Sequence, residues 1–418
     1  MDNKTKGAWI IHHKNKLDTV SGAQSDFEDI ILAGKCSVLL SSISCTNENE
    51  LDNARLYALA AAVGINRKLE LPNILSTLDK QRLINIGKQG IAVLGLTTSS
   101  VLEYTTQIYN ENEPNDIEES TIFLSEKASE SPIVTERAKE YISDVFNFDQ
   151  TTTDDIIDRG KRIGFFDYES IRTKQELLFN GNLFRNSDMT KVASVLASLT
   201  SDENRIMTEC NQLLDNSGCL PLEDIVKISG TDLFNKLQSI GLYDVSSVAN
   251  ESGECLFVTR PSSFCKFTSS QVDDAFDLAK AFVSSLTFGM LKSTGNRGKI
   301  RMIEALMRNL INGYWVGPAT AIGQDYKILE LKGVVQVKQE KNGLFSMKLL
   351  KKEVGELALA VIQDGSAVSG SLSMIPSANV STFLPPEHNR AITRKKLTAP
   401  LKKSVSEILD SIRTGDLQ

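Results

Sequence analysis

Residues 327–350 read KILELKGVVQVKQEKNGLFSMKLL, and this stretch decides the fold class. Apolar residues upstream and within it recur at the spacing of one helix face, namely Ile322, Tyr326 and Leu329. Gly333 is expected to end the helix, because a helix often ends at a residue with left-handed backbone angles and glycine adopts these angles with the smallest loss of free energy. Two β-rich runs follow and bracket Asn342-Gly343, a pair that tolerates positive φ and favours a hairpin. The stretch therefore predicts a helix followed by a β-hairpin.

The same pattern occurs three more times along the chain, in residues 71–96, 153–181 and 233–259. With Ile84, Gly164, Gly241 and Gly333 as landmarks, the copies are spaced by 80, 77 and 92 residues. A regular spacing of this size indicates an internal repeat. Each copy is preceded by a further expected helix, in residues 51–63, 133–146, 192–215 and 299–312.

The order helix, helix, β-hairpin resembles the winged helix-turn-helix superfamily. The resemblance covers most of residues 51–350, as four tandem copies. It implies that the last helix of each copy is a recognition helix and that the hairpin is its wing. An α+β protein of another kind can also contain two helices followed by a hairpin, so this alternative stays open.

The expected fold is predominantly α with small β-hairpins (α+β), arranged as a tandem array of winged-helix-like domains. An acidic stretch around Pro114 reads as a linker rather than packed structure. The expected domains are an N-terminal segment with the first unit (1–109), the acidic linker with the second unit (110–190), the third unit (191–269), a long helix with the basic fourth unit (270–363), and a flexible basic tail with a short amphipathic helix (364–418).

Composition places the chain among ordinary globular proteins. Of its 418 residues 41% are hydrophobic and 24% are charged, which argues against a disordered or membrane-spanning chain. No apolar run approaches the roughly 18 residues of a membrane helix, and no signal peptide is apparent. The six cysteines form no CxxC pair, which favours free thiols and a cytoplasmic location.

Charge is distributed unevenly along the chain. Residues 290–418 hold 19 Lys and Arg against 11 Asp and Glu, whereas the first 289 residues hold 27 against 42. This asymmetry suggests that the C-terminal part meets duplex DNA and that the acidic N-terminal units meet a protein partner. A drift of surface charge along a long chain is the alternative.

Motifs that would indicate catalysis or a cofactor are missing from the sequence. The three histidines, His12, His13 and His388, stand in no zinc-binding spacing, and there is no GxSxG nucleophile elbow. Residues 295–299 read GNRGK, which fails the spacing of a phosphate-binding loop. We therefore expect no metal, no cofactor and no enzymatic activity.

Candidate DNA-binding residues concentrate in the fourth unit, where Pro318 is expected to open the last helix. The outward face of that helix should offer polar groups that read base edges or phosphates, although Asp325 on the same side disfavours phosphates. The candidates are Thr320, Gln324 and Lys327 on the last helix, Lys338, Lys341 and Lys348 on the wing, Lys351 and Lys352 just beyond it, Arg297, Lys299 and Arg301 on the preceding helix, and Arg394, Lys395 and Lys396 in the tail.

These features favour a non-enzymatic DNA-binding protein, either a regulator or the DNA-engaging subunit of a complex. A second possibility is a winged-helix interaction scaffold, similar to the kite subunits that bind SMC-type ATPases, in a bacterial genome-maintenance or anti-phage complex. An enzyme with a divergent site is a third.

Overall fold

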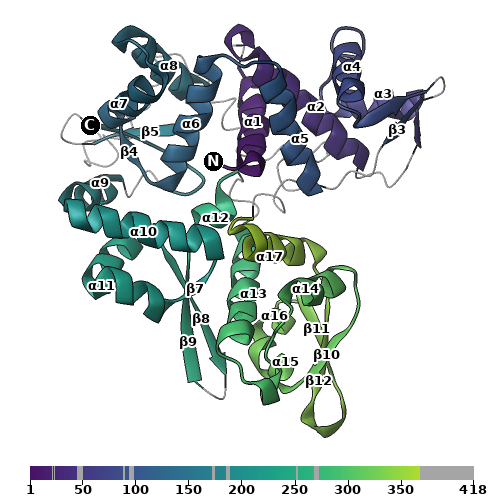
Figure 1. Cartoon of the computed structure of the whole chain (residues 1–418), viewed down its shortest axis with the longest axis vertical. Coiled ribbons are helices and arrows are strands. Elements are labelled where there is room, and N and C mark those ends of the chain that lie inside the picture. The colour runs from purple at the N-terminus through teal and green to yellow at the C-terminus, as the bar shows by residue number, and fades with distance from the viewer. Residues whose placement is uncertain are drawn as a thin grey trace, which may run out of the picture. The chain divides into compact units, whose positions relative to one another are not determined.

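The computed structural model describes residues 1–20, 22, 24–44, 50–87, 90–93, 98–171, 175–184, 189–250, 253–267 and 273–367. Helices make up most of this part of the chain, and its strands form four three-stranded antiparallel sheets (Figure 1). The prediction of a mainly helical α+β protein with small sheets is confirmed.

All four sheets are built from the same order of elements. A helix precedes a short first strand, two helices follow it, and two further strands close the copy, with the first strand hydrogen-bonded to the last. We number these copies repeat 1 to repeat 4. Repeat 1 consists of α2 (Glu28–Ser44), β1 (Glu50–Asp52), α3 (Asn53–Ala62), α4 (Leu71–Lys80), β2 (Ile84–Ile86) and β3 (Gly90–Val93). Repeat 2 consists of α6 (Asp116–Glu130), β4 (Ile133–Val134), α7 (Thr135–Phe146), α8 (Gln150–Ile163), β5 (Asp167–Ser170) and β6 (Glu176–Phe179).

Repeats 3 and 4 follow this order with one variation each. Repeat 3 consists of α10 (Ser201–Ser217), β7 (Leu220–Pro221), α11 (Leu222–Ser239), β8 (Asp244–Asn250) and β9 (Gly253–Thr259). Its two middle helices form the single element α11, which is broken at Gly230, where φ is +71°. Repeat 4 consists of α14 (Ile303–Ile311), β10 (Val316–Ala319), α15 (Thr320–Asp325), α16 (Lys327–Leu331), β11 (Val335–Gln339) and β12 (Phe345–Leu349). Here a break at Tyr326 separates the two middle helices.

The glycines that follow the last helix of repeats 2, 3 and 4 have the predicted left-handed conformation. Gly164, Gly241 and Gly333 all have positive φ, between 65° and 84°. In repeat 1 the corresponding residue is Arg82, with φ of 58°. The turn at Asn342-Gly343 also has positive φ at both residues, at 62° and 70°, as the hairpin signal predicted.

The acidic stretch of residues 110–130 is packed structure, so the prediction of a linker there is wrong. Most of it forms α6, whose N-cap Asn115 accepts a hydrogen bond from the backbone of Glu118. Acidic residues in the first turn of a helix interact favourably with its dipole, which is why their density here does not oppose folding. Eight residues of α6 are buried.

Glu118 on α6 is fully buried against the N-terminus of α2. Its carboxylate accepts hydrogen bonds from the backbone N–H groups of Asp29 and Ile30, both at 3.0 Å. Burial, assisted by the charge of Asp29, raises the pKa of Glu118 to about 7.

We predict that Glu118→Gln raises the free energy of unfolding at pH 8. A raised folded-state pKa supplies stability below the unfolded pKa of about 4.5, and this stability is lost as the pH rises through about 7. The glutamine amide stays neutral at both pH values and carries no cost of ionisation. The free energy of unfolding of the variant should therefore exceed that of the wild type by about 1–2 kcal/mol at pH 8 and by little at pH 5. Urea unfolding at both pH values measures the difference. Asp116→Asn, an exposed change on the same helix, is the control, and an equal stability of wild type and Glu118→Gln at pH 8 would contradict the prediction.

The start of repeat 4 differs from the prediction in two ways. Pro318 lies in β10, which pairs with β12, and the helix begins only at Thr320. The preceding helix begins at Ile303 rather than at Lys299. Strands of two to four residues are too short to show a period of their own, so the first strand of each repeat was missed.

Consecutive repeats share apolar cores. One core joins Leu51 and Ile74 of repeat 1 to Ile156 and Phe166 of repeat 2. A second joins β6 of repeat 2 to repeat 3, and a third joins repeat 3 to repeat 4. The remaining helices are α1 (Asn3–Leu17), α5 (Thr98–Glu111), α9 (Met189–Ser198), α12 (Ser262–Cys265), α13 (Asp273–Leu291) and α17 (Lys352–Asp364).

Helix α13 is the central element of the third core. The side chains of Phe276, Ala279, Phe282, Val283 and Leu286 are all fully buried, so one face of this long helix lies in the core. Helix α13 packs against α17 and β8, and thereby lies between the sheets of repeats 3 and 4 (Figure 1).

Candidate nucleic-acid interface

The candidate cations of repeat 4 fall into two groups along the chain. The hairpin group consists of Lys338 on β11, Lys341 in the turn (η5, Lys341–Gly343) and Lys348 on β12. The loop group, Lys299 and Arg301, lies between η4 (Gly295–Arg297) and α14, not on a helix as predicted. Lys351 is the N-cap residue of α17, and Lys352 is its first residue. Arg394, Lys395 and Lys396 lie outside the described residues.

Most cations in residues 290–355 have no carboxylate partner. Of the twelve, five form ion pairs, with Lys338 bound to Glu340 at 3.2 Å and Lys352 to Glu356 at 3.5 Å. No described carboxylate lies within 4 Å of the other seven, which are Lys299, Arg301, Lys327, Lys332, Lys341, Lys348 and Lys351. Earlier in the chain Lys35, Lys139, Lys161 and Lys236 are paired with acidic residues, although Lys68, Lys80 and Arg205 form no ion pair with a described carboxylate. Repeat 4 therefore carries a concentration of uncompensated positive charge.

The hairpin orients part of this charge to one side. Lys348 pairs across the strands with Gln336, and Lys338 pairs with Ser346. Directly paired residues, and residues two apart on one strand, point to the same face of a sheet. Lys338, Lys348 and Gln336 thus share one face, while Val335, Met347 and Leu349 on the other face are buried in the core.

Arg297 belongs to an internal network instead of the open surface. Its guanidinium donates hydrogen bonds to Asp325 Oδ1 and to Gln324 Oε1, both at 2.8 Å. The side chain of Asp325 is only 1% exposed, so the expectation that it faces outward is wrong. Thr320 Oγ1 donates to the backbone carbonyl of Arg297 at 3.2 Å. Thr320 and Gln324 are consequently half-buried and tied to the loop that precedes α14.

Helix α16 presents a mixed surface. Lys327 is exposed, as expected for a residue opposite the core face of Tyr326 and Leu329. Ile328 and Leu331 are also exposed, at 53% and 82%. Both residues lie off the predicted core face, and that position in the sequence is the signal for their exposure.

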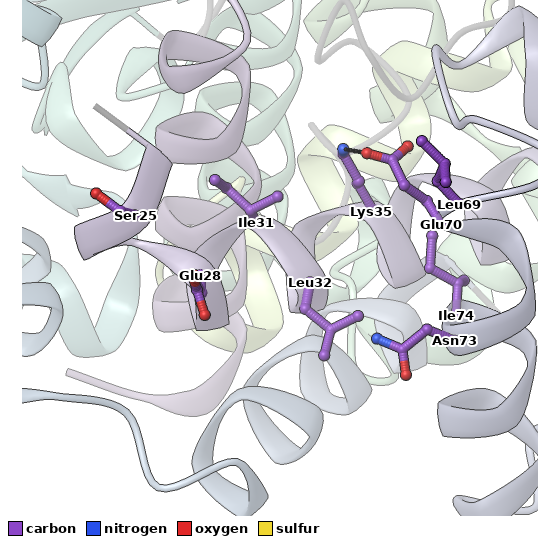
Figure 2. Close-up of a pocket in the computed structure, with 9 residues that line it drawn as sticks. All are labelled: Ser25, Glu28, Ile31, Leu32, Lys35, Leu69, Glu70, Asn73 and Ile74. Carbon is purple, nitrogen blue, oxygen red and sulfur yellow. Dashed lines mark hydrogen bonds and ion pairs between the residues drawn. The ribbon is translucent and has the colours of Figure 1, made fainter. Parts of the chain in front are cut away.

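A groove lies between α2 and the start of α4 in repeat 1 (Figure 2). It encloses about 460 Å³ and is lined by Ser25, Glu28, Ile31, Leu32, Lys35, Leu69, Glu70, Asn73 and Ile74. Lys35, the one cation among these nine described residues, is bound to Glu70 at 2.6 Å. The groove therefore offers no uncompensated positive charge to an anionic ligand.

His13 on α1 is buried and is held as a neutral ring. Its Nε2 lies 2.8 Å from Ser125 Oγ, and its ring stacks on Phe165 with centroids 4.0 Å apart. Burial, together with the charge of Lys16, lowers the pKa of His13 to about 3. Within the described part of the chain, no group of three or more His, Cys, Asp or Glu residues is placed to hold a metal ion.

None of the described helices has the length and apolar character needed to cross a bilayer. No protein-family model matches the chain, and neither a curated protein nor a solved structure shows a significant similarity to it.

Proposed function

We propose that each repeat is a winged helix-turn-helix unit. The support is the order of elements, in which a helix, a strand, two helices and a hairpin follow one another four times. The pairing of the first strand with the last in every sheet agrees with that assignment. In this arrangement α16 takes the place of the recognition helix of repeat 4, and the hairpin β11–β12 is its wing.

We further propose that the protein is a non-enzymatic, cytoplasmic DNA-binding protein that contacts duplex DNA through repeat 4. The observation that carries this proposal is the set of seven cations in residues 290–355 without a carboxylate partner among the described residues. Unpaired lysines and arginines repel one another, and a phosphate backbone compensates them with release of counterions. The basic residues of the tail would extend the same contact.

The wing and the loop group are better placed for this contact than α16. Ile328 and Leu331 on α16 would meet the polar floor of a major groove, where they gain nothing from base edges other than thymine methyl groups. Gln324 and Thr320 are already engaged by Arg297. We therefore expect contacts to phosphates that position the protein, with little sequence preference.

The test is the salt dependence of binding to a duplex of about 20 base pairs. Lys299→Glu, Lys341→Glu and Lys348→Glu together should weaken binding strongly at low salt and lower the slope of log K against log salt by about 3, since each phosphate contact contributes about 0.9. The matched control reverses three exposed cations of repeats 1 and 3 that form no ion pair with a described carboxylate, as Lys68→Glu, Lys80→Glu and Arg205→Glu. Equal losses in both triple variants, or no duplex affinity of the wild type at low salt, would overturn the proposal.

A second function is favoured by the exposed apolar residues of α16. Ile328 and Leu331 are suited to a protein interface, and the first 289 residues are acidic. The protein would then be a scaffold, similar to the kite partners of SMC-type ATPases or to a subunit of an anti-phage complex. Absence of DNA affinity combined with a stable complex with such an ATPase would replace the first function by this one.

A further inference from the structure

Two aromatic side chains are exposed next to the lysines of the repeat 4 wing. Tyr314 and Trp315 follow α14 directly and are 62% and 44% exposed. The other tryptophan of the chain, Trp9, is 1% exposed and donates a hydrogen bond from Nε1 to Glu126. Large aromatic rings lose favourable burial when they face water, so an exposed adjacent pair requires an explanation.

The strand register places Trp315 beside Lys348. Val316 pairs with Met347, and both are buried on the core face of the sheet. In an antiparallel pair the residue before Val316, which is Trp315, stands opposite the residue after Met347, which is Lys348, and both therefore belong to the opposite, outward face. The Lys348 side chain also runs across to the turn after α14, because a Cβ atom on Gly313 would lie 3.9 Å from Lys348 Cε.

The outward face of this sheet thus combines Trp315 with Gln336, Lys338 and Lys348, and the exposed Tyr314 directly precedes Trp315 in the chain. We call it the aromatic–lysine face. It is specific to repeat 4 among the repeats where the corresponding residues are described. Ser131 and Pro132 precede the first strand of repeat 2, and Gly218 and Cys219, both buried, precede that of repeat 3.

We propose that the aromatic–lysine face binds unpaired nucleotides of a single-stranded nucleic acid, an inference that rests on the nucleic-acid function proposed above for repeat 4. A base stacks on the ring of Trp315, the exposed ring of Tyr314 next to it in the chain offers a second platform, and Lys348 meets the adjoining phosphate. Lys338 lies on the same face but is bound to Glu340 at 3.2 Å. Stacking platforms flanked by cations are the common physical solution for single strands, because every base has a π-face and every nucleotide has a charge. Bases within a duplex are already stacked on one another and cannot use the two rings in this way.

Charge favours a nucleic acid over a protein as the occupant. Lysine is depleted from the cores of protein interfaces, whereas Lys348 lies directly beside the exposed rings. The net charge of residues 290–355 is also positive, with 12 basic against 5 acidic residues.

Tryptophan fluorescence tests the proposal on the full chain, because Trp9 is buried and Trp315 reports alone on the surface. Oligothymidylate of about twelve nucleotides should quench the emission at low salt, and a blunt duplex with the same number of phosphates should quench it little. Trp315→Phe should keep the single-strand affinity within a few-fold and lose the quenching. Trp315→Ala combined with Tyr314→Ala should weaken single-strand binding about tenfold or more and change duplex binding less than twofold.

Tyr168→Ala serves as the control, since Tyr168 is 49% exposed but belongs to repeat 2. Unchanged thermal unfolding of the double variant would show that its loss is not a loss of fold. Single-strand binding without quenching, equal loss of single-strand and duplex binding, or a Trp315 that acrylamide cannot reach in the free protein would each overturn this proposal while the duplex function stands. Failure of the wild type to bind any nucleic acid at low salt would overturn both.

Discussion

Arg297→Ala is expected to lower the free energy of unfolding by about 3 kcal/mol, although its sequence context had made Arg297 a candidate for DNA binding. The guanidinium is the cation that pairs with the carboxylate of Asp325, and the latter is 1% exposed. Without the arginine the buried Asp325 carboxylate loses its ion pair and hydrogen bond with the guanidinium. Removal of one partner of a buried ion pair is one of the few single changes that cost this much.

Arg301→Ala is the matched control for this variant. Arg301 lies four residues further along the chain, is exposed and has no carboxylate within 4 Å among the described residues, so its removal should change stability by less than about 0.5 kcal/mol. Adding Asp325→Asn to Arg297→Ala should recover part of the loss, because the buried group is then neutral. Urea unfolding of the variants measures these differences, and equal stabilities of Arg297→Ala and Arg301→Ala would show that the pair has no structural role.

Lys266→Met should have a similar effect at a different place, also about 3 kcal/mol. Lys266 Nζ binds Glu126 Oε1 at 2.7 Å, while Glu126 Oε2 accepts the indole N–H of Trp9 at 2.7 Å. Both charged side chains are largely buried, at 13% and 16% exposure. The backbone carbonyl of Lys266 also accepts hydrogen bonds from the side-chain amides of Asn180 and Asn182. The pair therefore joins α1 and α6 to the segment that follows repeat 3.

The pH dependence of this variant provides a second measurement. Burial alone would raise the pKa of Glu126, but the charge of Lys266 and the hydrogen bond from Trp9 outweigh it and hold that pKa below its usual range. A lowered folded pKa contributes stability above the unfolded value, and this contribution is lost as the pH falls through the folded pKa. In Lys266→Met the burial cost is no longer offset, so the pKa of Glu126 rises and the variant should be least stable, relative to wild type, near neutral pH.

Lys236→Met is the control for a pair at the surface. Lys236 binds Glu203 at 2.8 Å, but its side chain is 43% exposed, so water screens the interaction. The loss there should be below about 1 kcal/mol. If Lys266→Met destabilises no more than Lys236→Met, the buried pair contributes no more than an ordinary surface ion pair.

The spacing of apolar residues in the sequence predicts which helix faces are buried. The face formed by Ile322, Tyr326 and Leu329 is buried as predicted. The same reasoning failed in residues 110–130, because it weighed the acidic residues and not Ile122 and Leu124, which are buried. Charge density in the first turn of a helix is compatible with a packed opposite face.

The candidate site was less predictable because the pairing of charges is a tertiary property. Arg297 and Lys299 are two residues apart in the same loop, yet only Arg297 meets a buried carboxylate, from a helix 28 residues further on. The exposure of Tyr314 and Trp315 likewise depends on the strand β10 that follows them, and the sequence pattern does not predict this strand. The sequence shows which residue type stands at such a position, but the group that the residue contacts comes from a distant part of the chain.

The shared cores constrain how this chain can change its length over evolution. Leu177 and Phe179 of repeat 2 lie in one core with Leu233 and Val258 of repeat 3, and repeats 1 and 4 are joined to their neighbours in the same way. Duplicating or deleting one repeat would leave half of such a core facing water, at roughly 25 cal/mol for each Å² of apolar surface exposed. New properties are therefore more easily acquired by exchanging surface charges and loop residues of one repeat than by adding a further copy.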